Sequence, residues 1–252
     1  MARDSGMSEP GRGDVGVKES ACGPHTTQLT RFGLSNCYLV AEDDGLTLVD
    51  TSLRGSAGEI LAAAARIGRP IRRIAITHAH HDHAGALESL MECVPEAELA
   101  VGARESRLLR GDLTPQAGEP RGRLRGYLYE QAEVTPARLL AAGDRIGSLE
   151  VIAAPGHTPG HIGFLDTRDR TLLAGDAYIA VGELFVTTEL VWRFPFPALS
   201  GTWHAPTAIE AAQRLSDLEP ARIATGHGRI VEEPADEIAR ALRRARERKA
   251  WG

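Results

Sequence analysis

The stretch Thr77-His78-Ala79-His80-His81-Asp82-His83-Ala84-Gly85 is the most informative part of this 252-residue sequence. Four of the nine histidines of the chain fall within six positions there, together with one aspartate, in the pattern H-x-H-x-D-H. Clustered imidazole and carboxylate groups are the ligands that catalytic metal ions use in proteins. The pattern therefore predicts a metal site on this segment, and the flanking sequence indicates which kind of fold carries it.

The segments on either side of the cluster alternate between strand and helix patterns. Ile71–Ile76 is a short β-branched run that leads directly into the histidines and predicts a strand. Ala57–Ile67 is rich in alanine and stops at Gly68, and Ala84–Met91 follows the cluster, so both are predicted to be helices. This alternation indicates the α/β class, in which sites lie at the carboxyl ends of strands.

Two β-like runs precede these elements. Asn36–Ala41 and Leu46–Asp50 flank the turn signal Glu42-Asp43-Asp44-Gly45 and predict a β-hairpin. Asp50 ends the second run at the polar turn Thr51-Ser52. From the residues alone, two interpretations of Asp50 stay open: a carboxylate that forms the turn, or an acid that orients a neighbouring metal-binding loop.

Three later β runs end in a glycine that is immediately followed by histidine or aspartate. The pairs are Gly156-His157 after Leu149–Ala153, Gly175-Asp176 after Thr171–Ala174, and Gly226-His227 after Arg222–Ala224. Loop geometry accounts for the glycines, because glycine tolerates positive φ and close backbone approach. It does not account for a metal-ligand residue type in the next position each time. These residues are therefore further ligand candidates.

Composition limits the other possibilities. Residues 1–25 contain five glycines and almost no large apolar side chains, so we expect a disordered tail at 1–25 and a single domain at 26–252. The net charge of −5 gives no general attraction to nucleic acid or to anionic lipid. No apolar segment is long enough for a signal peptide or a membrane span, so the expected location is the cytoplasm. Three cysteines without C-x-x-C spacing argue against a disulfide framework and a thiolate zinc site.

The region from 103 to 145 is rich in arginine and glycine and has the weakest pattern of the domain. Short helices are predicted at Glu105–Arg110 and Leu124–Gln131. Two interpretations of the region stay open, a solvated insertion and a lid over the substrate. Regular patterns return in the C-terminal part, where Pro206–Leu218 and Pro234–Lys249 are predicted to be helices that begin near a proline.

In identity and order, the H-x-H-x-D-H cluster, the later G-H, the G-D and the final G-H resemble the motifs of the metallo-β-lactamase superfamily. The likeness extends from about Thr27 to Trp251 and is to the branch of lactonases and hydroxyacylglutathione hydrolases. It implies an αββα sandwich of two mixed β-sheets with outer helices, and a dinuclear metal site along one edge. Periodicity alone predicts no more than an α/β protein.

The resemblance also implies a set of seven ligands, in which one metal is bound by His78, His80 and His157, the second by Asp82, His83 and His227, and Asp176 bridges the two. Two divalent metal ions are the implied cofactors, with Zn²⁺ preferred and iron or manganese as alternatives. The resemblance favours the orienting role for Asp50 and leaves His81 outside the ligand set. His161 and His204 have no assigned role, although a place beside the ligands or the substrate is open to His161.

The implied chemistry is hydrolysis. Two cations a few ångströms apart lower the pKa of a shared water from about 15.7 to near 7, and the resulting hydroxide attacks a carbonyl carbon. Asp82 is expected to relay a proton to the leaving group. Tyr178, two positions after Asp176, resembles a tyrosine that lactonases keep near the bridging acid, so it is a second candidate catalytic residue.

Differences from individual subfamilies reduce the number of substrate classes to consider. Classical β-lactamases generally lack the bridging aspartate, so Asp176 argues against antibiotic hydrolysis, and the 25 residues after His227 leave no room for a helical glutathione-binding domain. The leading expectation is a small ester, lactone or thioester. A mononuclear iron oxidoreductase of the persulfide dioxygenase type and a phosphodiesterase are the alternatives. We expect a small-molecule substrate and no nucleic acid or membrane partner, and a homodimer stays open.

One bias in composition bears on the substrate. Half of the twelve aromatic residues of the chain lie in the 26 positions from Tyr178 to Trp203: Tyr178, Phe185, Trp192, Phe194, Phe196 and Trp203. The segment also contains prolines and glycines and lacks clear periodicity, so it is predicted to be a long loop beside the metals. We expect an aromatic wall there for an apolar acyl or ring-bearing substrate, with core packing as the alternative.

Overall fold

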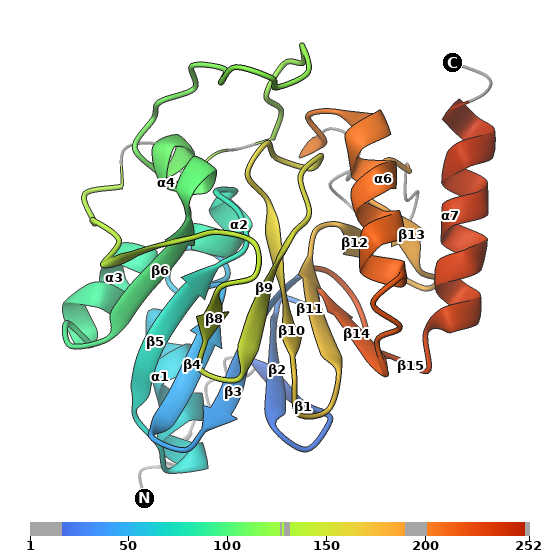
Figure 1. Cartoon of the computed structure of the whole chain (residues 1–252). Helices are drawn as coiled ribbons and strands as arrows, with labels where there is room; N and C mark the ends of the chain where they lie inside the picture. Colours follow the sequence, from blue (N-terminus) through green and yellow to red (C-terminus); the bar gives the residue numbers. More distant parts are fainter. Residues whose placement is uncertain (1–16, 127, 129–131, 190–200, 250–252) are drawn as a thin grey trace, which may run out of the picture.

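Two β-sheets lie face to face at the centre of the structure, a computed structural model that describes residues 17–126, 128, 132–189 and 201–249 (Figure 1). Helices cover the outer face of each sheet, which gives the four layers of an αββα sandwich (Figure 1). The fold predicted through the family resemblance is therefore confirmed.

The first sheet has seven strands in sequence order, antiparallel from β1 to β4 and parallel from β4 to β7. Helices α1, α2, α3 and α4 are interspersed among its later strands. The bounds are β1 Lys18–Cys22, β2 Thr26–Arg31, β3 Ser35–Glu42, β4 Gly45–Val49, α1 Ala57–Ile67, β5 Ile71–Ile76, α2 His81–Ala84, α3 Leu87–Cys93, β6 Glu98–Gly102, α4 Ala103–Leu109 and β7 Arg138–Leu140.

The second sheet has the strand order β15-β14-β11-β10-β9-β8, in which the β11–β14 pair is parallel and the other pairs are antiparallel. A separate hairpin, β12–β13, lies beside it. The bounds are β8 Arg145–Ile146, β9 Leu149–Ala153, β10 Ile162–Asp166, β11 Thr171–Gly175, β12 Tyr178–Ile179, β13 Phe185–Val186, α6 Ala205–Ser216, β14 Arg222–Thr225, β15 Val231–Glu232 and α7 Ala235–Lys249.

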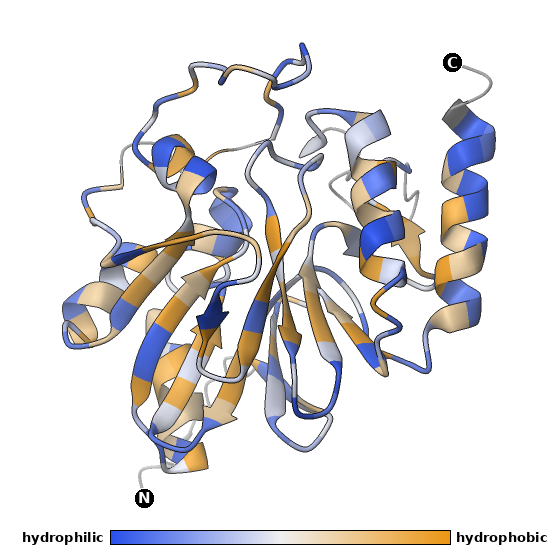
Figure 2. Cartoon of the chain, viewed as in Figure 1, coloured by the Kyte–Doolittle hydropathy of each residue, from blue (hydrophilic) through white to orange (hydrophobic). Residues whose placement is uncertain are grey.

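Three apolar clusters stabilise these layers. One lies between the first sheet and helices α1 and α3, one between the two sheets, and one between the second sheet and helices α6 and α7. Figure 2 shows the hydrophobic residues concentrated in the strands, whereas α7 carries hydrophilic residues along much of its outer side. No helix in the part of the chain that the structure describes is long and apolar enough to span a membrane.

Elements with strong local patterns appear where the sequence predicts them. Helix α1 and strands β5 and β9 have the predicted bounds, and the predicted hairpin is β3–β4. Its two strands are paired through Tyr38–Glu42 and Gly45–Val49. Helices α6 and α7 begin within a residue of their predicted starts, because each sequence signal was a proline at a helix N-terminus.

Three predictions about local structure are wrong. Lys18–Cys22, assigned to the disordered tail, pairs along its whole length with β2, which supplies the partner that its own composition does not indicate. The helix predicted at Ala84–Met91 is divided into α2 and α3, and α2 includes part of the histidine cluster. Within the predicted helix Leu124–Gln131, the described residues are not helical, and Leu128 forms an isolated β-bridge with His80.

Candidate metal centre

All seven predicted ligands meet at one edge of the sandwich. Those of the histidine cluster come from the loop after β5 and from α2, on the first sheet, and the other three follow β9, β11 and β14 of the second sheet. Their ligand atoms form three groups, each within 4.8 Å: His78-His80-His157, His78-His83-Asp176 and Asp82-His83-His227. Within the described residues, His81 belongs to none of these three groups.

Asp176 lies between the two predicted metal positions. Its Oδ2 is 3.5 Å from His157 Nε2, on the side of the first group, and 3.2 Å from His227 Nε2, on the side of the second. Its Oδ1 is 3.3 Å from His83 Nε2. One carboxylate therefore faces ligands of both groups, which is the position that a bridging ligand requires.

Each of the five histidines has one ring nitrogen fixed by the protein. Thr77 Oγ1 donates to Asp50 Oδ2 (2.8 Å), so it acts as the acceptor for His78 Nδ1 (3.0 Å). His83 Nδ1 donates to Asp50 Oδ2 (2.8 Å). With Nδ1 of both rings held in this way, Nε2 is the atom of each ring that faces the centre of the site.

The remaining three rings are held in the same manner by other groups. His80 Nε2 donates to the carbonyl oxygen of Arg125 (2.9 Å), and His227 Nδ1 donates to that of Leu34 (2.7 Å). His157 Nδ1 is hydrogen-bonded to Thr187 Oγ1 (2.9 Å). The nitrogens that face the centre are therefore Nδ1 of His80 and Nε2 of His157 and His227. Such outward hydrogen bonds fix the tautomer and the ring orientation of metal-binding histidines.

The inward atoms fit divalent cations. His80 Nδ1 and His157 Nε2 approach to 2.9 Å, so two ligand atoms of the first group already face each other closely. His78 Nε2, His83 Nε2 and Asp176 Oδ1 are buried without a hydrogen-bond partner. Buried lone pairs that face one another are unfavourable unless a cation lies among them. The donor set, imidazole and carboxylate, is the one that zinc and iron use.

The charge balance of the centre favours cations as well. Burial lowers the pKa of His78 and of His157 well below the ordinary value, so both rings stay neutral. Burial acts in the same direction on His227, but the carboxylates of Asp176 and Asp82 outweigh it and raise its pKa to about 10. The two carboxylates thus create a field that attracts positive charge to the position where the free nitrogens converge.

The comparison with protein families agrees with this geometry. A family model described as the metallo-β-lactamase superfamily matches residues 30–227, a range that contains every candidate ligand. The chain belongs to the metallo-β-lactamase superfamily.

Individual members of the superfamily are similar over most of this chain. YobT of Bacillus subtilis (strain 168), described as an uncharacterized protein, is 41% identical over 84% of this chain and 90% of its own length. The probable metallo-hydrolase YflN of the same organism is 30% identical over 83% of this chain and 85% of its own. The crystal structure of TTHA1623 in a di-iron-bound form has a TM-score of 0.58 and 26% identity, and covers 80% of this chain and 91% of that one.

Asp50 has the orienting role that the resemblance to the superfamily favoured. Its carboxylate accepts the backbone N–H of Thr77 (2.8 Å) as well as the Thr77 hydroxyl, and it also accepts from His83. Asp50 has φ +62°, a left-handed conformation that aspartate tolerates better than most residues. One buried acid therefore connects the loop after β4 to ligands of both groups.

Glu105 of α4 is a second buried acid that connects the ligand segments, and the sequence analysis missed it. Oε2 accepts from the backbone N–H of Ala79 (2.7 Å), and Oε1 accepts from Thr158 Oγ1 (2.6 Å) and the backbone N–H of Gly160 (2.9 Å). Burial raises its pKa to about 7, against the effect of these donors. Its spacing in the sequence could have indicated the burial: Glu105 lies three and four positions before Leu108 and Leu109, on the same inward face of the helix. A buried carboxylate needs hydrogen-bond donors, so its position suggests a structural or functional contact.

The other histidines differ in position. His161 is buried, and its Nε2 accepts the backbone N–H of Asp176 (3.0 Å), so it holds the loop that carries the shared carboxylate. His204 caps helix α6, where its Nδ1 accepts from the backbone N–H of Thr207. His161 therefore belongs to the surroundings of the metal-ligand site, whereas His204 has a local structural contact.

The structure does not place Tyr178 at the metal centre. The side chain is fully buried among residues of β12, α6 and α7, and its hydroxyl donates to the carbonyl oxygen of Ala212 on α6 (2.7 Å). Ile179, the next residue of β12, faces a different apolar cluster. The prediction of a catalytic Tyr178 is corrected accordingly: strand alternation turns this side chain toward the core.

The predicted aromatic wall is only partly visible. Phe185 is half-buried under the guanidinium of Arg244, which lies 4.9 Å from the ring centroid, and Trp203 is buried. Trp192, Phe194 and Phe196 lie outside the described residues. The Thr202 hydroxyl donates to the carbonyl oxygen of Thr187 (2.8 Å), and the same hydroxyl lies next to the ring of His157, a candidate ligand. The wall thus stays a prediction for its central part.

The segment 121–126 packs against the outer side of His80, a ligand of the first group. An ideal Cβ added to Gly126 would lie 2.5 Å from His80 Nε2, and one added to Gly122 would lie 2.8 Å from Trp203 Nε1. Glycine is needed at both positions because the backbone lies too close to these side chains to leave room for a Cβ atom. Residues 121–126 are therefore not simply solvated, because they support a candidate ligand, and the alternative of a substrate lid for residues 103–145 stays open.

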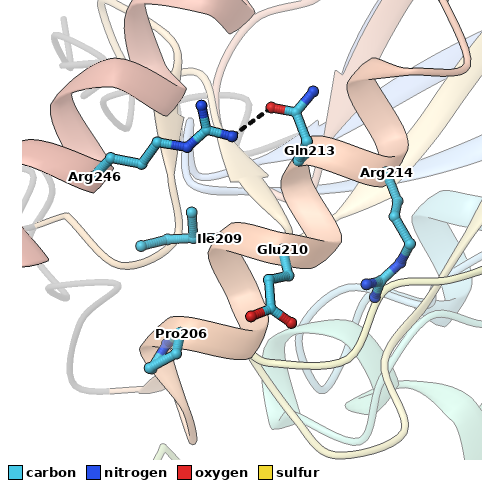
Figure 3. Close-up of a pocket in the computed structure, with 6 residues that line it drawn as sticks. All are labelled: Pro206, Ile209, Glu210, Gln213, Arg214 and Arg246. Carbon is cyan, nitrogen blue, oxygen red and sulfur yellow. Dashed lines mark hydrogen bonds between the residues drawn. The ribbon is translucent and has the colours of Figure 1, made fainter.

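A second concave surface lies away from this chemistry. A groove of about 440 Å³ runs between α6 and α7 (Figure 3), and Arg246 donates to Gln213 across it (2.6 Å). None of the seven candidate ligands lines it, and its only carboxylate is Glu210. The buried histidine and aspartate cluster, rather than this groove, is therefore the candidate functional site.

Proposed function

We propose that this protein is a dinuclear metal-dependent hydrolase that cleaves a small ester, lactone or thioester at the carbonyl carbon. The main support is the position of Asp176 between two groups of ligands whose free atoms all face inward. The similarity to YflN, which is named a probable metallo-hydrolase, is consistent with hydrolysis.

In this proposal each cation has its own group of three protein ligands, and Asp176 is shared. The first group is His78, His80 and His157, and the second is Asp82, His83 and His227. Bound divalent cations would supply Lewis-acid activation of water and of a carbonyl oxygen. Zn²⁺ is the first choice for these ligands, and iron is the alternative in view of the di-iron form of TTHA1623.

The protein groups prepare this chemistry by holding the ligands before any substrate arrives. Hydrogen bonds from the imidazole rings to Asp50 and to the carbonyl oxygens of Arg125 and Leu34 fix ring orientation, so little reorganisation is needed during reaction.

Asp82 indicates the open side. Its side chain is 37% exposed, whereas that of Asp176 is 5% exposed. A carboxylate at the solvent-facing side is suited to take a proton from the attacking water and give it to the leaving oxygen or sulfur. We therefore assign the proton transfer to Asp82 Oδ1 or Oδ2.

A mononuclear iron oxidoreductase would need only the first group and Asp176. The complete second group is the feature that favours a hydrolase, because Asp82, His83 and His227 would otherwise have no common task.

The test combines metal analysis with a substrate panel. The full chain is stripped with chelator, loaded separately with Zn²⁺, Mn²⁺ or Fe²⁺, and assayed on an ester, a lactone, a thioester, a persulfide and bis(p-nitrophenyl) phosphate. We expect about two metal ions per chain and turnover of a carbonyl substrate. One iron per chain with oxidation of the persulfide, or preferential cleavage of the phosphodiester, would refute the proposal.

A matched pair of variants separates the site from general destabilisation. Asp176→Asn should abolish turnover, because the amide has no negative charge and keeps only one oxygen that can act as a ligand. Asp166→Asn alters another buried aspartate of the second sheet, at the end of β10 that is remote from His161, where it pairs with Arg168 (2.6 Å). Asp166→Asn should lower stability and leave the rate per folded molecule unchanged.

A further inference from the structure

We propose that Glu105 is a positioning residue that assembles the first metal-binding group by fixing two ligand segments at once. This inference rests on the metal-binding part of the proposed function. Glu105 touches none of the ligands, so its effect would act through the backbone on either side of them.

The contacts of the carboxylate define what it holds. Ala79, whose N–H is bound by Oε2, lies between His78 and His80 in the chain. Thr158, whose hydroxyl is bound by Oε1, directly follows His157. All three ligands of the first group are therefore adjacent in sequence to a residue that donates to this one side chain.

Glu105 lies where a loop of the first sheet meets a loop of the second. The loop of His78 and His80 follows β5 of the first sheet, and the loop of His157 follows β9 of the second. His80 Nδ1 and His157 Nε2, from these two loops, are only 2.9 Å apart. Something must hold these loops together before the metal binds, and a fully buried carboxylate with three donors, on a helix that belongs to neither loop, does so.

The second group depends on different contacts. His83 is fixed by Asp50, and His227 by the carbonyl oxygen of Leu34. Loss of Glu105 should therefore weaken one metal position more than the other. This selectivity distinguishes positioning from a general contribution to stability.

Glutamine is the sharpest replacement, because it keeps the shape of the side chain. In Glu105→Gln only one oxygen remains, so an NH₂ group must face either the N–H of Ala79 or the two donors at Thr158 and Gly160. One ligand segment is released in either orientation. Thr158→Val is a milder variant that removes a single donor and keeps the experiment informative if Glu105→Gln folds poorly.

Glu42→Gln is the matched control. Glu42 is also a buried glutamate that accepts from three donors, the backbone N–H and the hydroxyl of Ser148 and the hydroxyl of Thr47. It lies at the end of β3 opposite Ser35, whose hydroxyl contacts the ligand segment at Asp82. The control therefore removes a similar set of bonds away from the metal centre.

The measurement is titration of Co²⁺ into chelator-stripped full-length protein, followed by the visible absorption of the bound ion, together with thermal unfolding of each metal-free variant. We expect wild type and Glu42→Gln to bind two Co²⁺ with the same spectra. Glu105→Gln should bind one Co²⁺ normally and the other at least about tenfold more weakly, with an altered spectrum. Thr158→Val should show the same change to a smaller extent.

The outcomes separate the two proposals. If wild type binds no Co²⁺, the proposed function itself fails. If wild type binds two ions and Glu105→Gln binds both with unchanged affinity and spectra, Glu105 is only a structural residue and the inference is overturned. The inference is equally overturned if Glu42→Gln weakens Co²⁺ binding as much as Glu105→Gln does.

Discussion

Gly126 offers a direct test of whether the segment 121–126 is part of the metal centre. The Arg125 carbonyl next to it accepts the hydrogen bond from His80 Nε2 that leaves Nδ1 free as a ligand. Gly126 has φ +82°, and an added Cβ would lie 2.5 Å from His80 Nε2. Gly126→Ala therefore introduces two separate costs, one in the backbone and one against the imidazole.

The backbone cost can be isolated with Gly118→Ala. Gly118 has φ +88° and an added Cβ there would meet nothing within 4 Å, so this variant carries the same conformational penalty without a contact. A left-handed alanine costs about 1–2 kcal/mol, so Gly118→Ala should lose roughly that much free energy of unfolding in metal-free protein, and Gly126→Ala should lose more. Their difference then reports on His80 alone.

The contact should appear in metal binding. Ordinary Cβ contacts begin near 3.4 Å, so in Gly126→Ala the ring or the segment must move by roughly 1 Å, more than the about 0.5 Å that a preorganised site tolerates. Misplacing a ligand that is held from outside typically lowers metal affinity about 10- to 100-fold. Isothermal titration with Zn²⁺ should show this loss for one of two ions in Gly126→Ala and not in Gly118→Ala. Equal affinities in the two variants would refute the assignment of segment 121–126 to the site.

Three further variants probe other parts of the structure. Asp50→Asn replaces the acceptor of His83 Nδ1 and should lower affinity for the second metal about 10- to 100-fold, which a competition assay with a chromophoric chelator measures; an unchanged affinity would contradict the orienting role. Tyr178→Phe removes the bond to Ala212 and should cost about 1 kcal/mol of stability in urea without changing kcat/KM, whereas a loss of kcat would restore the catalytic role. Phe32 is 53% exposed at φ +53° in a tight turn, so Phe32→Asn should raise the urea midpoint by the equivalent of about 1 kcal/mol; a lower midpoint would mean that the contact with Arg31 outweighs the backbone strain.

The sequence was sufficient for those features that depend on side-chain identity and local pattern. Strand β5 and helix α1 follow from apolar periodicity, and the seven ligands are residue types whose grouping is rare without a metal. Strand β1 was not predictable in this way, because it is fixed by pairing with β2 rather than by its own polar composition. Its case shows how tertiary contacts override local propensity.

Contacts made through the backbone left no trace in the sequence either. The carbonyl oxygens of Arg125 and Leu34 orient His80 and His227. Because every residue has a backbone carbonyl, the identity of these two residues does not indicate the contact. Only the neighbouring Gly126 hints at the first contact, through its need for positive φ and close approach. The predicted catalytic role of Tyr178 failed for a related reason. Its distance in sequence from Asp176 does not indicate on which face of β12 the side chain lies.

The two buried acids, Asp50 and Glu105, hold different parts of the metal centre. Asp50 follows β4 and holds His83 and, through Thr77, His78, so it acts within the ligands of the first sheet. Glu105 instead reaches from one sheet's loop to the other's, at Ala79 and Thr158. Asp176 lies where these two systems meet. The metal centre is thus also a junction between the sheets, and the opposite ends of the strands have their own junction, in which Glu42 binds Ser148. Because that second junction is independent of metal, removal of the metal ions should loosen one edge of the sandwich and leave the other paired.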